Sequence, residues 1–334
     1  MNELAAIVRH LNRSDQPSAL ATLVTVSGSS YRRPGARLLV TADRERIGSV
    51  SGGCLEEDVL ARATRVLATG TPELVTYDTT SENDLVWGVG LGCHGVVQVL
   101  IEKLPPRPSW ATTVATNLAA HRPTDLAVIY QSTASKNIGT HLASDVAANT
   151  SEPSVRTFLN PLPAPTALHV FGAGDDARPL IRMAKELGWH VTLADPRRDF
   201  ATAPRFPLAD QVIVAPAAEL VSRLPSIPNS LAVVMTHHYV HDVPILRDLL
   251  ASPNFRYIGL LGPRKRAERI LADLEKTGTS IAPETRHRLH APVGLDLGAE
   301  TPEEVALSIV AEIQAFLSNR DARPLRHRKQ PIHG

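Results

Sequence analysis

The chain has 334 residues, 43% of them hydrophobic and 21% charged, and a formal net charge of +1. This length allows roughly two domains of ordinary globular composition. The near-neutral charge gives no reason to expect nucleic acid or an anionic membrane as a partner, and two cysteines do not make a disulfide framework.

The N-terminal residues 1–13 are predicted to form an amphipathic helix with Leu4, Ile7, Val8 and Leu11 on its inner face. This segment lacks the apolar core and the small-residue cleavage site of a signal peptide. No run in the chain approaches the roughly 20 apolar residues that cross a bilayer. We therefore expect a cytoplasmic protein with no membrane partner and with reduced cysteines.

Residues 1–150 are predicted to form a mixed α/β domain. Apolar runs rich in β-branched residues indicate strands, and a run with helical spacing that stops at Gly70 indicates a second helix. The predicted strands are 19–26, 37–41, 47–50, 74–77, 96–101 and 126–130, and the predicted helix is 55–68.

A proline-rich segment separates the two predicted domains. Residues 151–166 contain Pro153, Pro161, Pro163 and Pro165, which favour an extended backbone that pairs poorly. We interpret residues 151–166 as an interdomain linker.

Strands and helices alternate beyond the linker, which is typical of a doubly wound parallel sheet. This pattern predicts a Rossmann-like domain over 167–318 and, after it, a solvated basic tail over 319–334. The predicted strands are 168–171, 190–194, 211–215, 231–236 and 257–261, and the helices are 177–187, 243–250 and one that runs from a capping box at 301–304 to about 317.

A dinucleotide-binding fingerprint opens the second domain. Gly172 and Gly174 follow a strand and precede a helix, and Asp195 closes the next strand, where an acid that binds a ribose is expected. However, Asp175 and Asp176 lie at the helix N-terminus, where they would satisfy the helix dipole and repel phosphates. The sequence therefore predicts the fold and leaves nucleotide binding open.

Both cysteines lie in glycine-rich loops. Gly52, Gly53 and Cys54 run into the helix at 55–68, and Gly92 and Cys93 precede a strand. Glycine gives the backbone freedom and close approach, which suits a thiol presented to a ligand, whereas a buried, purely structural cysteine is the alternative. The helix dipole favours the thiolate of Cys54, but acidic residues in the first turn oppose this effect.

An arginine-rich stretch precedes the second strand. Arg32, Arg33 and Arg37 lie among glycines and hydroxyl groups, a composition that suits a phosphate or a pterin-linked diphosphate. The alternative is a hairpin loop with solvated arginines. The cysteine spacing disfavours a zinc site and no metal ligand set is predicted, while a disulfide between Cys54 and Cys93 stays possible in principle.

Several motifs occur together along the chain and resemble a known family, the xanthine dehydrogenase accessory proteins (XdhC/CoxI). The motifs are Gly28-Ser29-Ser30, Arg33-Pro34-Gly35-Ala36, the run from Gly48 to Glu56, Gly90-Leu91-Gly92-Cys93, the run from His169 to Gly174, the run from Val233 to His237, the run from Tyr257 to Gly262 and the run from Ala291 to Glu304.

This resemblance implies a maturation factor that binds molybdenum cofactor of the molybdopterin type. It further implies help with sulfuration by a cysteine desulfurase and insertion into an apo molybdenum hydroxylase of the xanthine dehydrogenase type. We expect a cofactor-binding chaperone with no catalytic residues, and a homodimer is possible.

Two departures from the family pattern bear on the second domain. Asp175 and Asp176 are more acidic than is usual there, and His237 is followed by His238-Tyr239 where a second histidine often comes two positions on. We therefore interpret His237 as a structural histidine at a strand end.

Two other functions stay open. A Rossmann-like domain is compatible with an NAD(P)-dependent oxidoreductase, although no acid–base pair with a substrate site can be assigned from the sequence. The glycine loops are also compatible with a surface that only docks a partner enzyme.

Overall fold

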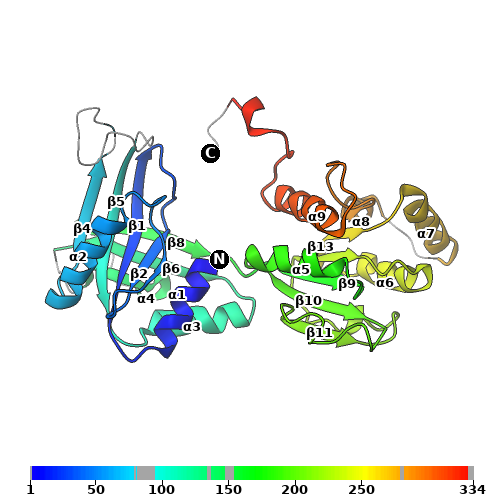
Figure 1. Cartoon of the computed structure of the whole chain (residues 1–334), viewed down its shortest axis with the longest axis horizontal. Helices are drawn as coiled ribbons and strands as arrows, with labels where there is room; N and C mark the ends of the chain where they lie inside the picture. Colours follow the sequence, from blue (N-terminus) through cyan, green and yellow to red (C-terminus); the bar gives the residue numbers. More distant parts are fainter. Residues whose placement is uncertain are drawn as a thin grey trace. The chain divides into compact units, whose positions relative to one another are not determined.

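The computed structural model describes residues 2–78, 80, 95–133, 137–146, 154–278 and 282–329. The chain divides into two compact units, Met1–Pro165 and Thr166–Gly334, whose elements are labelled in Figure 1.

The first unit contains a five-stranded antiparallel sheet in the order β3-β2-β1-β5-β4. Successive residues of its central strand face opposite sides, as the period of a strand requires. Ala21 and Leu23 pack in the cluster that contains α2, whereas Leu20 packs with α1 and α3. The elements are α1 (Asn2–Arg13), β1 (Ser18–Gly28), β2 (Arg37–Val40), β3 (Arg46–Gly48), α2 (Glu56–Thr69), β4 (Glu73–Asp78), β5 (Gly95–Leu104) and α3 (Ser109–Ala119).

A smaller antiparallel sheet completes this unit, in the order β7-β6-β8. Leu126 and Leu162 from this sheet join the cluster formed by α1, α3 and the large sheet, so the two helices share one core with both sheets. The elements are β6 (Thr124–Gln131), β7 (Gly139–Leu142), α4 (Ala143–Val146) and β8 (Arg156–Leu162).

The prediction of a poorly pairing linker over 151–166 was wrong for most of its described residues. Residues 156–162 form β8, which pairs with β6, and Pro161 lies opposite Asp125. A proline is tolerated here because β8 is at the edge of its sheet. An edge strand pairs on one side only, so the N–H that proline lacks is not needed for pairing with a second strand. The boundary between the two units follows Pro165.

The second unit is a six-stranded parallel sheet in the order β11-β10-β9-β12-β13-β14. This is the strand order of a Rossmann fold, so the predicted fold class is confirmed. The elements are β9 (Ala167–Phe171), α5 (Ala177–Glu186), β10 (His190–Asp195), β11 (Gln211–Val214), η2 (Val221–Arg223), β12 (Ser230–Val234), α6 (Tyr239–Ala251), β13 (Phe255–Leu260), α7 (Arg264–Lys276), α8 (Pro283–His287), β14 (Leu289–His290), α9 (Pro302–Leu317) and η3 (Leu325–His327).

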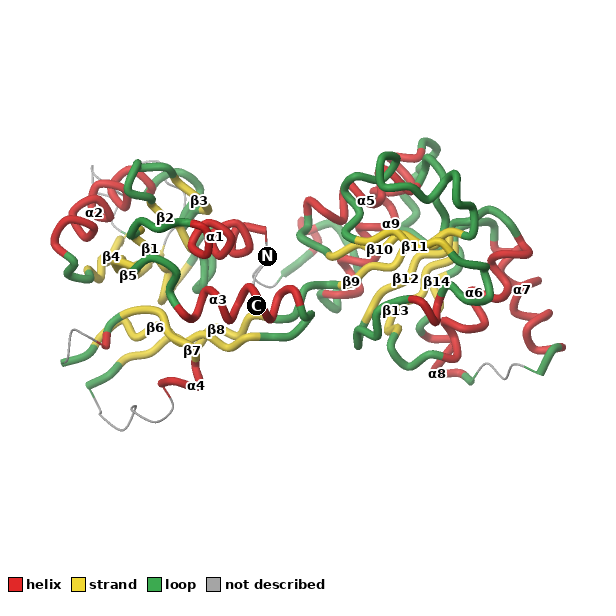
Figure 2. Tube along the Cα trace, turned by 90° about the horizontal axis from the view of Figure 1, so that it is seen from below, coloured by secondary structure: helices red, strands yellow, loops and turns green. Residues whose placement is uncertain are grey.

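Helices cover both faces of this sheet (Figure 2). Leu168 and Val170 of β9 pack with α5 and α9, whereas Phe171 packs with α6 and α7. The predicted capping box at the start of α9 is confirmed, since Thr301 Oγ1 accepts from the Glu304 amide at 3.3 Å and Glu304 Oε2 accepts from the Thr301 amide at 2.9 Å. Within the described ranges, no helix is both long and apolar enough to cross a membrane.

The C-terminal part of the sheet differs from the prediction. β14 adds one more parallel strand beside β13, where the sequence suggested that 257–261 was the last strand. Two residues are too few to show strand periodicity, and only the pairing with β13 defines them.

Candidate functional site

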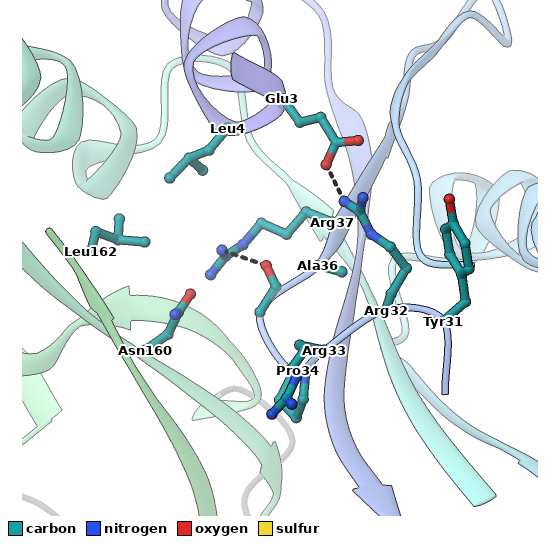
Figure 3. A pocket seen from close by; sticks show the side chains of 11 residues that line it. Glu3, Leu4, Tyr31, Arg32, Arg33, Pro34, Ala36, Arg37, Asn160 and Leu162 are labelled. Atoms are coloured by element: carbon teal, nitrogen blue, oxygen red, sulfur yellow. Dashed lines mark hydrogen bonds and ion pairs between the residues drawn. The ribbon is translucent and has the colours of Figure 1, made fainter. Parts of the chain in front are cut away.

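The first candidate site is a pocket of about 400 Å³ in the first unit. Part of its wall is the loop between β1 and β2, and the rest comes from α1, from Arg37 at the start of β2 and from β8. The lining residues are Glu3, Leu4, Tyr31, Arg32, Arg33, Pro34, Gly35, Ala36, Arg37, Asn160 and Leu162, and Figure 3 shows their side chains.

Arg37 is the buried cation of this pocket. Arg37 is only 4% exposed. Its Nη1 donates a hydrogen bond to the Gly35 carbonyl oxygen at 3.1 Å. Nε and Nη2 have no hydrogen-bond partner among the described residues. Burial lowers the pKa of Arg37 to about 10, although the charge of Glu102 opposes this. Figure 3 shows the guanidinium pointing toward the space beside Leu4, Leu162 and Asn160.

Asn160 faces the same space from β8. Its side chain packs on Gly35, where an added Cβ would lie 3.1 Å from Nδ2. Its Oδ1 is buried without a hydrogen-bond partner. The pocket therefore contains both unused donors, on Arg37, and an unused acceptor, on Asn160.

The other two arginines lie nearer the surface. Arg32 forms an ion pair with Glu3 of α1, and Arg33, a predicted site residue, is exposed at the pocket wall. The sequence-based choice of an arginine loop is consistent with this arrangement, whereas Asn160 was missed because it lies in the segment interpreted as a linker.

The loop that carries Cys54 is held by a short hydrogen-bond network. Ser51 donates to the buried Glu56 carboxylate from its amide at 2.9 Å and from its hydroxyl. The Ser51 hydroxyl oxygen accepts from the amides of Gly53 and Leu55, each at 3.1 Å. Burial alone would raise the pKa of Glu56, but the hydrogen bonds from Ser51 outweigh it and lower the pKa.

This network presents Cys54 on the surface. Cys54 carries a free thiol and is exposed, and Cys93, its partner in the disulfide left open by the sequence, lies outside the described residues. Gly53 has φ +111° with open space beside it, a backbone conformation that favours glycine. Gly52 lies against Tyr31, whose ring would be 3.4 Å from an added Cβ. Because Tyr31 also lines the arginine pocket, the thiol loop and the pocket are neighbours.

The second cysteine loop contains Gly92 and Cys93. Both lie outside the described residues. The described chain resumes at Gly95, which pairs with Gly28 at the start of the arginine loop.

The second candidate site is the carboxyl edge of the parallel sheet, between β9 and β12, where the strand order reverses. Gly172 allows the two strands to end close together. It has φ +123°, and an added Cβ would lie 2.5 Å from the Met235 carbonyl oxygen. Its amide donates to the Ala194 carbonyl at 2.9 Å, so this glycine has a packing role whether or not a nucleotide binds.

Asp195 lies below the glycine loop and is fully buried. It accepts from the Ala173 amide at 2.6 Å and from the Arg197 amide at 2.7 Å, and Arg197 also donates to both oxygens from its guanidinium. Burial alone would raise the pKa of Asp195, but the hydrogen bonds from Arg197 and Ala173 lower it. Binding of a ribose by Asp195 stays a prediction. It requires Arg197 to give up its hydrogen bonds to one of the Asp195 carboxylate oxygens.

The two acids of the glycine loop, expected to satisfy the dipole of α5, instead pair with other side chains. Asp176 is the N-cap residue, but its side chain makes no capping hydrogen bond. It folds over Gly174 instead, where a Cβ would overlap Oδ1, and Oδ2 pairs with His237 Nε2 at 2.6 Å. Asp175 turns outward to Arg205 at 2.9 Å. The Asp176 carboxylate thus covers the glycine that a pyrophosphate would approach.

His237 has an unusual backbone for a histidine, with φ +61°. The hydrogen bond that His237 donates to the Asp176 carboxylate raises the pKa of His237 against the opposing effect of burial. Behind it, Arg266 donates to the His237 carbonyl at 3.3 Å and pairs with the buried Asp242. The interpretation of His237 as a strand-end structural histidine did not include its pairing with Asp176. A signal was available, because β9 and β12 end side by side at the switch point of the predicted sheet.

Among the described residues, no group of three or more His, Cys, Asp or Glu side chains is placed to hold a metal ion.

Two family models match the chain. The model of the XdhC and CoxI family matches residues 11–78, and the model of the XdhC Rossmann domain matches residues 168–313. These matches cover the cysteine loop at 52–54 and the arginine loop of the first unit, and the glycine loop of the second.

Relatives match over nearly the whole length. The chain is 33% identical over 330 residues to a Bacillus subtilis (strain 168) protein described as a probable xanthine dehydrogenase subunit, covering 94% of this chain and 97% of that protein. It is 24% identical over 301 residues to the molybdenum cofactor insertion chaperone PaoD of Escherichia coli (strain K12), covering 90% and 83%. A crystal structure of a Bacillus halodurans protein described as a xanthine dehydrogenase matches with a TM-score of 0.80 and 30% identity, covering 97% of this chain and 99% of that one.

Proposed function

Because the chain belongs to the XdhC and CoxI family, we propose that it is an accessory factor that matures molybdenum hydroxylases of the xanthine dehydrogenase type. In this proposal it binds molybdenum cofactor, assists sulfuration by a cysteine desulfurase and inserts the cofactor into the apo-hydroxylase. The similarity to PaoD, a molybdenum cofactor insertion chaperone, supports this role.

The observation that carries the proposal is the exposed thiol of Cys54 beside an arginine-lined pocket. Thiolates are soft ligands that bind transition metals and accept sulfur, and guanidinium groups bind phosphate. Molybdopterin-type cofactors have a metal at one end and a phosphate at the other. The residues present therefore fit such a group, with Cys54 near the metal and sulfur chemistry and the arginines near the phosphate.

In this proposal the chain's own residues hold the cofactor and shield it. Ser51 and Glu56 fix the loop so that Cys54 points outward, and Tyr31 covers Gly52 on the side of the pocket. When bound, the cofactor supplies the metal centre that the hydroxylase later uses.

The Cys54→Ser variant tests the proposal. We expect it to retain molybdenum cofactor at least about tenfold more weakly than the wild type, equivalent to about 1.4 kcal/mol of binding free energy. Retention is measured by gel filtration of loaded protein followed by metal and pterin analysis of the protein peak. A parallel assay follows activation of an apo-hydroxylase.

Two further variants control this experiment. Glu57→Gln changes an exposed charge in the first turn of α2 and should leave retention unchanged. Cys93→Ser examines the second loop. Wild-type retention by both cysteine variants would show that neither thiol holds the cofactor.

A further inference from the structure

The arginine pocket contains a buried positive charge that no carboxylate of the described residues contacts directly. Arg37 is 4% exposed, and its one hydrogen bond goes to the neutral Gly35 carbonyl. Nε and Nη2 have no hydrogen-bond partner in the described part of the chain. Buried guanidinium groups are normally paired with an anion, because the loss of hydration is otherwise uncompensated.

Glu102 of β5 acts on Arg37 electrostatically, but it does not supply this anion. Its oxygens accept hydrogen bonds from the Thr140 amide at 3.0 Å and from the Thr140 hydroxyl at 2.5 Å. The Glu102 carboxylate is thus held by Thr140, and among the described residues no anion contacts Nε or Nη2 of Arg37. An anionic ligand in the pocket would supply that contact.

The pocket also specifies what kind of anion fits. Among the described residues, the buried unused groups of the pocket are two donor nitrogens of Arg37, Nε and Nη2, and one acceptor, Asn160 Oδ1. The ionised residues that line it are three arginines and one glutamate, and that glutamate, Glu3, is already paired with Arg32. The ligand should therefore carry negative charge with several acceptor oxygens and at least one hydrogen-bond donor.

We propose that this pocket is a phosphate-binding subsite and that it holds the terminal phosphate monoester of the pterin cofactor. The assignment of the phosphate to the cofactor rests on the proposed function. A phosphate monoester has three acceptor oxygens for a guanidinium fork. Its second pKa of about 6 leaves a fraction of P–OH groups near neutral pH, and this group can donate to Asn160 Oδ1. A carboxylate has no such donor when it is charged.

Phosphate binding by the unloaded full-length protein is the first test. Inorganic phosphate is titrated calorimetrically into the wild type, Arg37→Met and Arg122→Met at constant ionic strength in chloride buffer. Arg122 is an exposed arginine of the same unit, outside the pocket. We expect saturable binding by the wild type and Arg122→Met, and binding at least about tenfold weaker by Arg37→Met.

A second variant keeps the test decisive if Arg37→Met does not fold. Asn160→Leu removes the acceptor at similar side-chain size and should weaken phosphate binding severalfold, with circular dichroism confirming the fold. Absence of saturable binding by the wild type, or equal binding by the wild type and a folded Arg37→Met, would overturn the phosphate site.

Cofactor release distinguishes the source of the phosphate. Loaded Arg37→Met should lose cofactor faster than loaded Arg122→Met. Equal release rates, in an Arg37→Met protein that no longer binds phosphate, would overturn the assignment to the cofactor. Phosphate binding by unloaded protein does not require Cys54, so failure of the thiol role and failure of this pocket give different results.

Discussion

At the scale of single residues, Asp176 decides how the Rossmann-like unit presents its glycine loop. Its carboxylate covers Gly174 and pairs with His237 at 2.6 Å. His237 in turn holds a left-handed backbone, φ +61°, which is sparsely populated for residues other than glycine. The pair connects the start of α5 to the residues after β12, across the switch point of the sheet.

The Asp176→Asn variant should lower the pKa of His237, because the hydrogen bond that His237 donates to the Asp176 carboxylate is the main cause of its raised pKa. A raised pKa means that the pair stabilises the fold fully below the unfolded value of about 6.5, and that this contribution is lost as the pH rises through the folded pKa. The variant should therefore lose more stability at pH 6 than at pH 9. Histidine titration by NMR and urea unfolding at both pH values measure these effects.

Asp175→Asn is the matched control for that variant. Asp175 is the neighbouring carboxylate and pairs with Arg205 and Arg178, so its loss should leave the titration of His237 unchanged. An unaltered His237 titration in Asp176→Asn would contradict the role of the pair.

At the scale of elements, the clearest predictions came from local patterns. The inner face expected for α1 is borne out for Ile7, Val8 and Leu11, which are buried, whereas Leu4 is partly buried and packs against the same cluster. β8 shows the opposite case. The prolines of 151–166 predict poor pairing, and only the neighbouring strand reveals that an edge position tolerates Pro161 within β8. α7 shows a missed signal, since its buried Ala267, Ile270, Leu271 and Leu274 follow helical spacing.

The capping box of α9 gives a prediction at this scale. Thr301→Ala removes the acceptor for the Glu304 amide and should lower the free energy of unfolding by about 1 kcal/mol. Thr301→Asp restores a capping acceptor and should recover most of that loss. Urea unfolding followed by circular dichroism measures both, and an Asp variant as unstable as the Ala variant would count against the cap.

At the scale of the whole molecule, each hydrophobic cluster draws its residues from a single unit. The clusters around α2 and around α1 and α3 belong to the first unit, and those on the two faces of the parallel sheet belong to the second. Separate cores are the basis on which domains unfold separately.

Leu23→Ala tests this separation. Leu23 is fully buried in the cluster around α2 of the first unit. Its truncation should lower the free energy of unfolding by about 2–5 kcal/mol. We expect calorimetry to show two transitions, with only one shifted to lower temperature. A single transition that moves as a whole would show that the units unfold together.

The sequence by itself determined the features that depend on neighbouring residues. Strand and helix periodicity, the turn after β9 and the cap of α9 are local, and so are the glycine loop around Cys54 and the arginine loop. Tertiary structure decided which groups meet. It set Arg37 opposite Asn160 from a different sheet, and it joined Asp176 to His237 across 61 positions. Such pairs leave no periodic trace, because burial and hydrogen bonding between distant segments arise only when the sheets have formed.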